Sequence, residues 1–102
     1  VDNKPKKEEN KKEDGKPRAY TEETLGIIAR FFHSIDFLVS AKQIRGKATY
    51  CRNYNLDRRH FDAQAKNHSL GHFQVSWLLG LIKDYNISAD WLLTGKGDMF
   101  KK

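Results

Sequence analysis

The chain lacks several features that whole classes of protein require. It has a single cysteine, Cys51, so no disulfide forms within the chain and a disulfide-bonded scaffold is excluded. It has no run of about 18 apolar residues, and its start lacks the apolar centre of a secretory signal. These absences favour a cytoplasmic protein that neither spans a membrane nor binds to one.

Apolar residues are almost missing from the first 18 positions, where Val1 is the only one. This segment carries seven basic and five acidic residues and both prolines. Because it has almost nothing to bury, we expect residues 1–18 to form a disordered, charged tail. Residues 19–102 hold 38 apolar residues among 84, which is enough for the core of one small domain.

Positive charge is concentrated in one segment. The formal net charge of the chain is +6, and residues 42–66 contribute +5 through seven basic and two acidic residues. The rest of residues 19–102 is therefore nearly neutral. A local basic segment is typical of a surface that binds a polyanion, although a basic, solvated surface without a ligand has the same composition.

The apolar pattern predicts helices and no strands. The first predicted helix runs over about residues 22–38 or slightly beyond, because apolar residues recur there at steps of three and four. The residues of this stripe are Leu25, Ile28, Ala29, Phe32, Ile35 and Val39, and it is widened by Phe31, Phe37 and Leu38. Further helices are expected over residues 47–54, 58–67, 74–85 and 89–93. Thr21, Asp57 and Ser88 are suited to cap three of them, and Asn55 suits a left-handed turn between the second and third. The predicted fold is all-α, with five helices.

The segment around Asn55 resembles the helix-turn-helix of phage-repressor and Cro-like DNA-binding proteins. Cys51 takes the place of the small residue in the first motif helix, Asn55 that of the turn residue, and Leu56 and Phe61 two of the apolar places. Residues 87–100, which include Ser88-Ala89-Asp90-Trp91-Leu92-Leu93-Thr94-Gly95-Lys96-Gly97, resemble the last helix and tail of small bacterial repressor-like proteins. Cys51, Asn55 and Lys47 replace the family's usual Ala, Gly and Gln.

This resemblance implies that residues 19–102 form a repressor-like helix-turn-helix domain that binds double-stranded DNA and regulates transcription. On a helix over residues 58–67, Phe61, Gln64, Ala65 and His68 fall on one face and the basic residues on the other. The candidates for reading bases in the major groove are Arg58, Arg59, Asp62 and Ala63. The candidates for holding phosphates are Arg45, Lys47, Arg52, His60 and Lys66. A homodimer on a two-fold site is also expected.

Other functions receive less support from the residues. Cys51, His60, His68 and His72 lack the paired spacing of structural zinc ligands, so no metal or other cofactor is expected. Cys51 as a buried thiol is expected to be inert, and no glycine-rich phosphate loop precedes a helix, so we predict neither an enzyme nor a small-molecule substrate. We expect the aromatic residues Phe73, Trp77, Trp91 and Phe100 to pack in the core or at its rim. Two alternatives to DNA binding stay open: a protein-interaction module on the same scaffold, and RNA binding.

Overall fold

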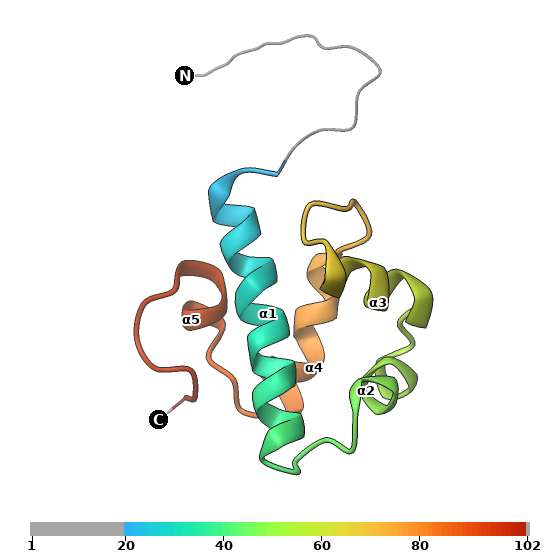
Figure 1. Cartoon of the computed structure of the whole chain (residues 1–102). Coiled ribbons are helices and arrows are strands. Elements are labelled where there is room, and N and C mark those ends of the chain that lie inside the picture. The colour runs from blue at the N-terminus through green and yellow to red at the C-terminus, as the bar shows by residue number, and fades with distance from the viewer. Residues whose placement is uncertain (1–19, 102) are drawn as a thin grey trace, which may run out of the picture.

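The computed structural model describes residues 20–101, which are predominantly helical and include no strand. The tail predicted over residues 1–18 lies outside the described part. Helix α1 (Glu22–Ser40) begins where the Thr21 hydroxyl accepts a hydrogen bond from the Thr24 N–H at 3.2 Å. It runs through the centre of the fold, with α5 on one side and α2 and α3 on the other (Figure 1).

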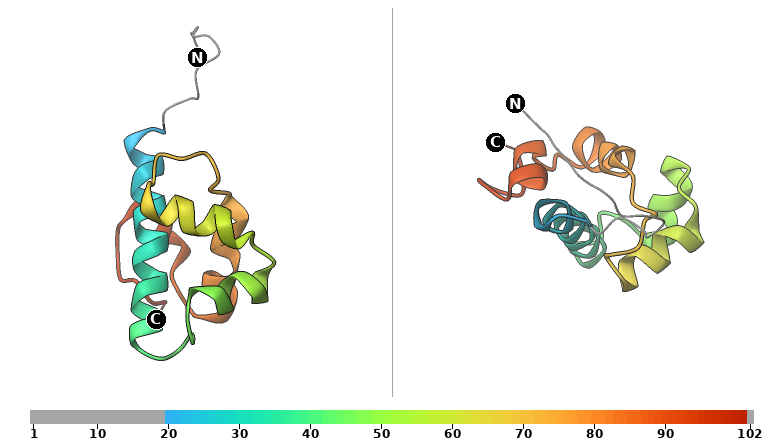
Figure 2. Two further views of the ribbon diagram at one scale, coloured as in Figure 1. Left: turned by 45° about the vertical axis from the view of Figure 1, so that its right-hand side comes forward. Right: turned by 90° about the horizontal axis from the view of Figure 1, so that it is seen from above.

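Two short helices follow, α2 (Lys47–Tyr54) and α3 (Arg58–Lys66), and they pack against each other. Their bounds agree with the predicted ones to within one residue. α3 runs crosswise to α1 on the side away from α5 (Figure 2). The order of elements continues with a short 3-10 helix, η1 (Val75–Leu78), and with α4 (Leu79–Asp84).

The prediction of one continuous helix over residues 74–85 is therefore wrong in its first turn. The Trp77 N–H donates to the Gln74 carbonyl at 2.9 Å, three residues back, as the tighter 3-10 winding requires. This segment lacks a side-chain cap. Trp77 and Leu78 are both buried, so tertiary packing of two consecutive large residues accompanies the tighter turn.

The last helix, α5 (Ala89–Thr94), is capped by the Ser88 hydroxyl, which accepts from the Trp91 N–H at 3.2 Å. Gly95 ends it with φ +77°, as expected for a glycine after a helix. Arg30 Nε of α1 donates to the Leu92 carbonyl at 2.8 Å and ties α5 to α1. The chain then returns alongside its own residues 86–88, where an isolated antiparallel bridge pairs Ile87 with Phe100.

The core is built around Phe31 of α1, which is fully buried. Its ring lies within 6.0 Å, centroid to centroid, of the rings of Phe32, Tyr50, Phe61, Phe73 and Trp77. Two members of the predicted α1 stripe were misplaced, because Ala29 is exposed and Phe37 is 43% exposed. Residues 20–101 include no helix with the length and apolar character needed to cross a membrane.

Candidate nucleic-acid interface

The turn between α2 and α3 is made by Asn55, which has φ +60° and ψ +45°. An L-residue reaches this left-handed region at a cost, and Asn is among the residues that tolerate it best. The N–H groups of Asn55 and Leu56 both donate to the Cys51 carbonyl, the latter at 2.8 Å, and close the end of α2. The turn therefore redirects the chain within three residues.

Asp57 starts α3 by accepting a hydrogen bond from the His60 N–H at 3.0 Å. This bond stabilises the carboxylate and lowers the pKa of Asp57 below its ordinary value. The same oxygen lies 4.0 Å from Nδ1 of the His60 side chain. The first turn of α3 itself contains no acidic residue, so the carboxylate that stabilises the start of this helix is that of its cap, Asp57.

Phe61 and Gln64 hold α3 against the rest of the fold. Phe61 is fully buried, with its ring centroid 5.2 Å from that of Phe32 and 5.7 Å from that of Trp77. Gln64 is also fully buried. The sequence prediction that this face of α3 packs inward is therefore confirmed, and the opposite face is left to solvent.

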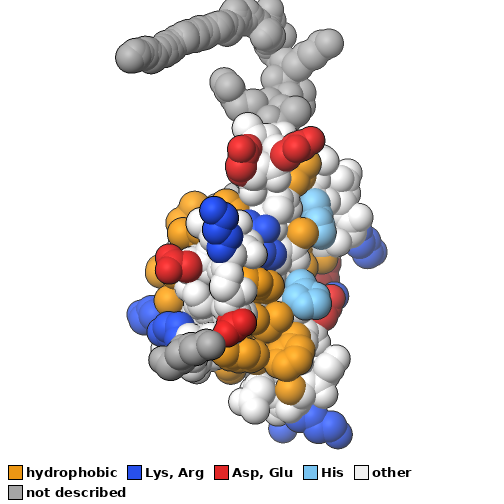
Figure 3. Space-filling model, turned by 90° about the vertical axis from the view of Figure 1, so that its left-hand side faces the viewer, with side chains coloured by type: hydrophobic (Ala, Val, Ile, Leu, Met, Phe, Trp, Pro, Cys, Tyr) orange, Lys and Arg blue, Asp and Glu red, His pale blue; other side chains and the backbone are white. Residues whose placement is uncertain are grey.

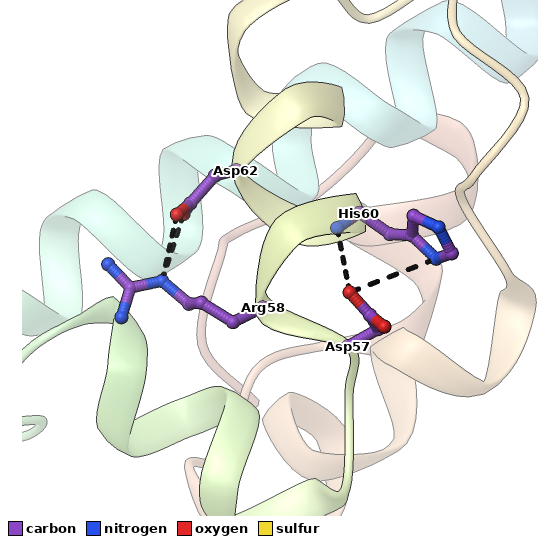
Figure 4. A network of polar contacts seen from close by, with 4 residues as sticks. All are labelled: Asp57, Arg58, His60 and Asp62. Atoms are coloured by element: carbon purple, nitrogen blue, oxygen red, sulfur yellow. Dashed lines mark hydrogen bonds and ion pairs between the residues drawn. The ribbon is translucent and has the colours of Figure 1, made fainter.

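The four base-reading candidates lie together on α3 but differ in exposure and partners. Arg58 and Arg59 are exposed, while Asp62 and Ala63 are partly buried. Arg58 Nε donates to both carboxylate oxygens of Asp62, at 3.1 and 3.0 Å (Figure 4). Arg59 has no side-chain hydrogen bond or ion pair within residues 20–101. The structure therefore brings two of the candidates into one ion pair, which the sequence prediction treated as independent readers.

The five phosphate candidates are spread over three places. Lys66 lies at the end of α3, Arg52 on α2, and Arg45 in the loop before α2, and all three side chains are exposed. Lys47 Nζ lies 3.7 Å from Oδ1 of Asp36 in α1, so its charge is partly balanced within the chain. Asp36 is a neighbour that the sequence prediction missed, because the pair joins two helices.

His60, the fifth phosphate candidate, also has a neighbour that the sequence prediction missed. Its ring stacks on that of His72, with centroids 4.2 Å apart and planes 8° apart. The two histidines are twelve residues apart, and His72 belongs to the loop after α3. The loop returns because Gln64 Oε1 accepts the His72 N–H at 2.9 Å. No periodicity in the sequence predicts this contact.

Cys51 is a free thiol on the buried inner side of α2. Burial raises the pKa of the thiol above its ordinary value, and the charge of Arg58 opposes that rise. Within the described residues, no three side chains of His, Cys, Asp or Glu gather into a group that could hold a metal ion.

A different surface lies on the side of the molecule where α5 packs. Hydrophobic side chains gather there over the lower part of the face shown in Figure 3. Phe37 and Phe100, which are 43% and 37% exposed, meet with ring centroids 5.7 Å apart. They border a cavity of about 540 Å³ that Leu38 and Tyr85 also line. Phe100 is therefore a rim residue, as expected, whereas Trp77 belongs to the core.

No family model, curated protein or solved structure matches this chain.

Proposed function

We propose that the chain is a sequence-specific DNA-binding protein of phage-repressor type, in which α2, the Asn55 turn and α3 act as a helix-turn-helix. α3 enters the major groove of double-stranded DNA, and its first turn reads base edges. Regulation of transcription, as a repressor-like protein, is the biological role that this activity serves.

One observation carries the proposal: α3 is docked by Phe61 and Gln64 on one face, and presents Arg58 and Arg59 to solvent on the other. The major groove of B-DNA admits a helix, and arginine is the side chain that pairs most often with guanine there. Lys66 and Arg52 are exposed on α3 and α2, which supports the proposal that they hold phosphates.

A single helix of this length reads only a few base pairs. We therefore propose that two copies bind a two-fold site, with half-sites separated by about one turn of DNA. The two-fold arrangement supplies specificity that one copy of α3 lacks.

Selection of bound duplexes from a random pool, followed by titration of the best duplex, tests the proposal. Titrations of the full chain at about 50 mM and about 200 mM salt measure the electrostatic part of binding. Replacing Arg59 by Ala is expected to cost about 1 to 3 kcal/mol and to relax preference at one base pair. Replacing Lys66 by Ala is expected to weaken all duplexes and to flatten the salt dependence.

Lys96 is a matched control, because it is an exposed lysine two residues after the end of α5, and α5 lies on the other side of α1 from α3 (Figure 1). Its replacement by Ala is expected to leave base preference unchanged. Failure to enrich any sequence, or equal losses for Arg59→Ala and Lys66→Ala on every duplex, contradicts base reading by α3. Tighter binding to single-stranded or hairpin RNA than to any duplex supports the RNA alternative.

A protein-interaction module is a second candidate, which the exposed Phe37 and Phe100 pair favours. Contiguous exposed apolar side chains mark surfaces that bind other proteins. Under this alternative, the chain has little affinity for duplex DNA, and joint replacement of Arg58 and Arg59 by Ala leaves binding of the partner protein intact. Replacement of Phe37 by Ser is then expected to abolish binding of the partner protein.

A further inference from the structure

The ion pair between Arg58 and Asp62 is a feature of α3 that the stability of the fold does not explain. The two side chains are 52% and 40% exposed. Ion pairs at i and i+4 on an exposed helix face contribute little to folding, because water screens both charges. The pair also places a carboxylate on the face that is proposed to meet phosphates, where negative charge weakens binding.

The hydrogen bonds of the pair use only one corner of the guanidinium group. Both oxygens of Asp62 accept from Nε of Arg58, at 3.1 and 3.0 Å. An arginine side chain has five N–H donors in a planar fork, and four of them are on the two terminal nitrogens. In Figure 4 these terminal nitrogens point away from Asp62. Neither has a hydrogen-bond partner within residues 20–101.

Such a guanidinium group can form a pair of hydrogen bonds with a base in only one way. Because Nε is occupied, a base must be approached end-on, with one donor from each terminal nitrogen. Guanine presents the matching pair of acceptors, O6 and N7, at the edge of the major groove, whereas adenine presents one acceptor and one donor. A side chain already held in its bound geometry also loses less conformational freedom on binding.

We propose that Asp62 is a positioning residue that holds Arg58 end-on for guanine, and that it does not itself read a cytosine. This inference rests on the proposed function and deepens it, because it names the base that the first turn of α3 selects. Within residues 20–101 the Arg59 side chain has no hydrogen bond or ion pair with a carboxylate, so it serves as the internal comparison for Arg58.

The test uses the full chain and the duplex selected from the random pool. At each position of the half-site, it also uses the three duplexes that carry the other base pairs. The wild-type chain is expected to prefer guanine at one position by roughly 5- to 100-fold. Replacing Asp62 by Asn keeps the size of the side chain and removes its charge. We expect this variant to lose most of that preference, while its affinity for an unrelated duplex rises by about twofold or more.

Arg58→Lys is the second variant, because lysine keeps the charge but lacks the fork. It is expected to lose the same guanine preference. Arg59→Lys changes the other proposed base reader, so it is expected to relax preference at a different position and to leave the position of Arg58 unchanged. Combining Asp62→Asn with Arg58→Lys is expected to add no further loss of preference. Thermal unfolding of each variant confirms that it is folded.

Two results overturn the inference while leaving the proposed function standing. One is an Asp62→Asn variant that binds duplexes with its guanine preference intact. The other is a loss of preference at a cytosine position when Asp62 is replaced, because it assigns base reading to the carboxylate itself. Absence of any sequence-dependent duplex binding by the wild-type chain overturns the proposed function as well.

Discussion

The side-chain oxygen of Gln64, in α3, accepts a hydrogen bond from the backbone N–H of Phe73 at 3.1 Å. The same oxygen accepts from the His72 N–H at 2.9 Å, and Nε2 of Gln64 donates to the His68 carbonyl at 2.7 Å. One buried amide therefore holds the loop that follows α3. That loop places His72 against His60 and Phe73 against Phe31.

Replacing Gln64 by Leu is expected to lower the free energy of unfolding by about 3 kcal/mol, because three backbone groups of the loop lose their partner. Urea denaturation followed by circular dichroism measures the change. Gln74, an exposed glutamine, is the control, and its replacement by Leu is expected to change stability by less than about 0.5 kcal/mol. Equal stability of the two variants contradicts the role given to Gln64.

Gly80 in α4 is predicted to be intolerant of a side chain. A Cβ atom built there lies 2.7 Å from the Tyr50 hydroxyl and 2.7 Å from ring carbons of Tyr54. The resulting overpacking is expected to cost about 1 to 3 kcal/mol. Alanine favours a helix over glycine by up to about 1 kcal/mol, so the net change is a loss of stability.

Thermal denaturation of Gly80→Ala and Gly71→Ala measures this difference. A Cβ atom at Gly71 meets nothing within 4 Å, so that variant is expected to unfold at the wild-type temperature. A Gly80→Ala chain with a raised midpoint contradicts the close packing of α4 on α2.

The stability of the fold is expected to decrease above about pH 10 because of Tyr50. Burial raises the pKa of Tyr50 well above its ordinary value of 10.0, and its hydroxyl donates to the Trp77 carbonyl at 2.7 Å. The unfolded chain loses this proton near the ordinary pKa while the folded chain keeps it. The contribution of Tyr50 to stability is therefore complete below that pH and is lost as the pH rises further.

Urea denaturation at about pH 8 and about pH 11 tests the dependence. In Tyr50→Phe the decrease is expected to be smaller, because no hydroxyl titrates at that position. Burial also raises the pKa of Tyr54, so part of the decrease in stability is expected to remain in that variant. An unchanged pH dependence in Tyr50→Phe is the contrary result.

The Cys51 thiol is expected to resist alkylation in the folded protein. Only 3% of the residue is exposed, and burial raises the pKa of the thiol, so the reactive thiolate is scarce at neutral pH. Mass spectrometry after treatment with iodoacetamide is expected to show modification in concentrated urea and little without it. Rapid modification of the native chain means that α2 does not stay packed.

Local chemistry made much of this structure predictable. Thr21, Asp57 and Ser88 were identified as caps from residue type and position, and each accepts the hydrogen bond expected of a cap. The turn at Asn55 was predictable for the same reason, since few side chains tolerate positive φ. Each of the three cap bonds joins residues three positions apart, so these bonds are visible in the sequence.

Contacts between distant segments were not predictable in this way. The 3-10 turn at Val75–Leu78, the exposure of Phe37 and the pairing of Ile87 with Phe100 depend on what each segment packs against. At the candidate site, the spacing of Arg58 and Asp62 was a readable signal of their ion pair. The contacts of Lys47 with Asp36 and of His60 with His72 carried no such signal.

The amino-acid sequence alone determined that the chain is helical, where most of its helices begin and end, and which face of α3 turns inward. These properties follow from apolar periodicity and from capping, which act over one or two helical turns. Only the tertiary structure decided which side chains of α2 and α3 meet partners from other elements, as Lys47 meets Asp36 and His60 meets His72. Partners from α1 and from the loop after α3 reach them through packing over longer distances along the chain.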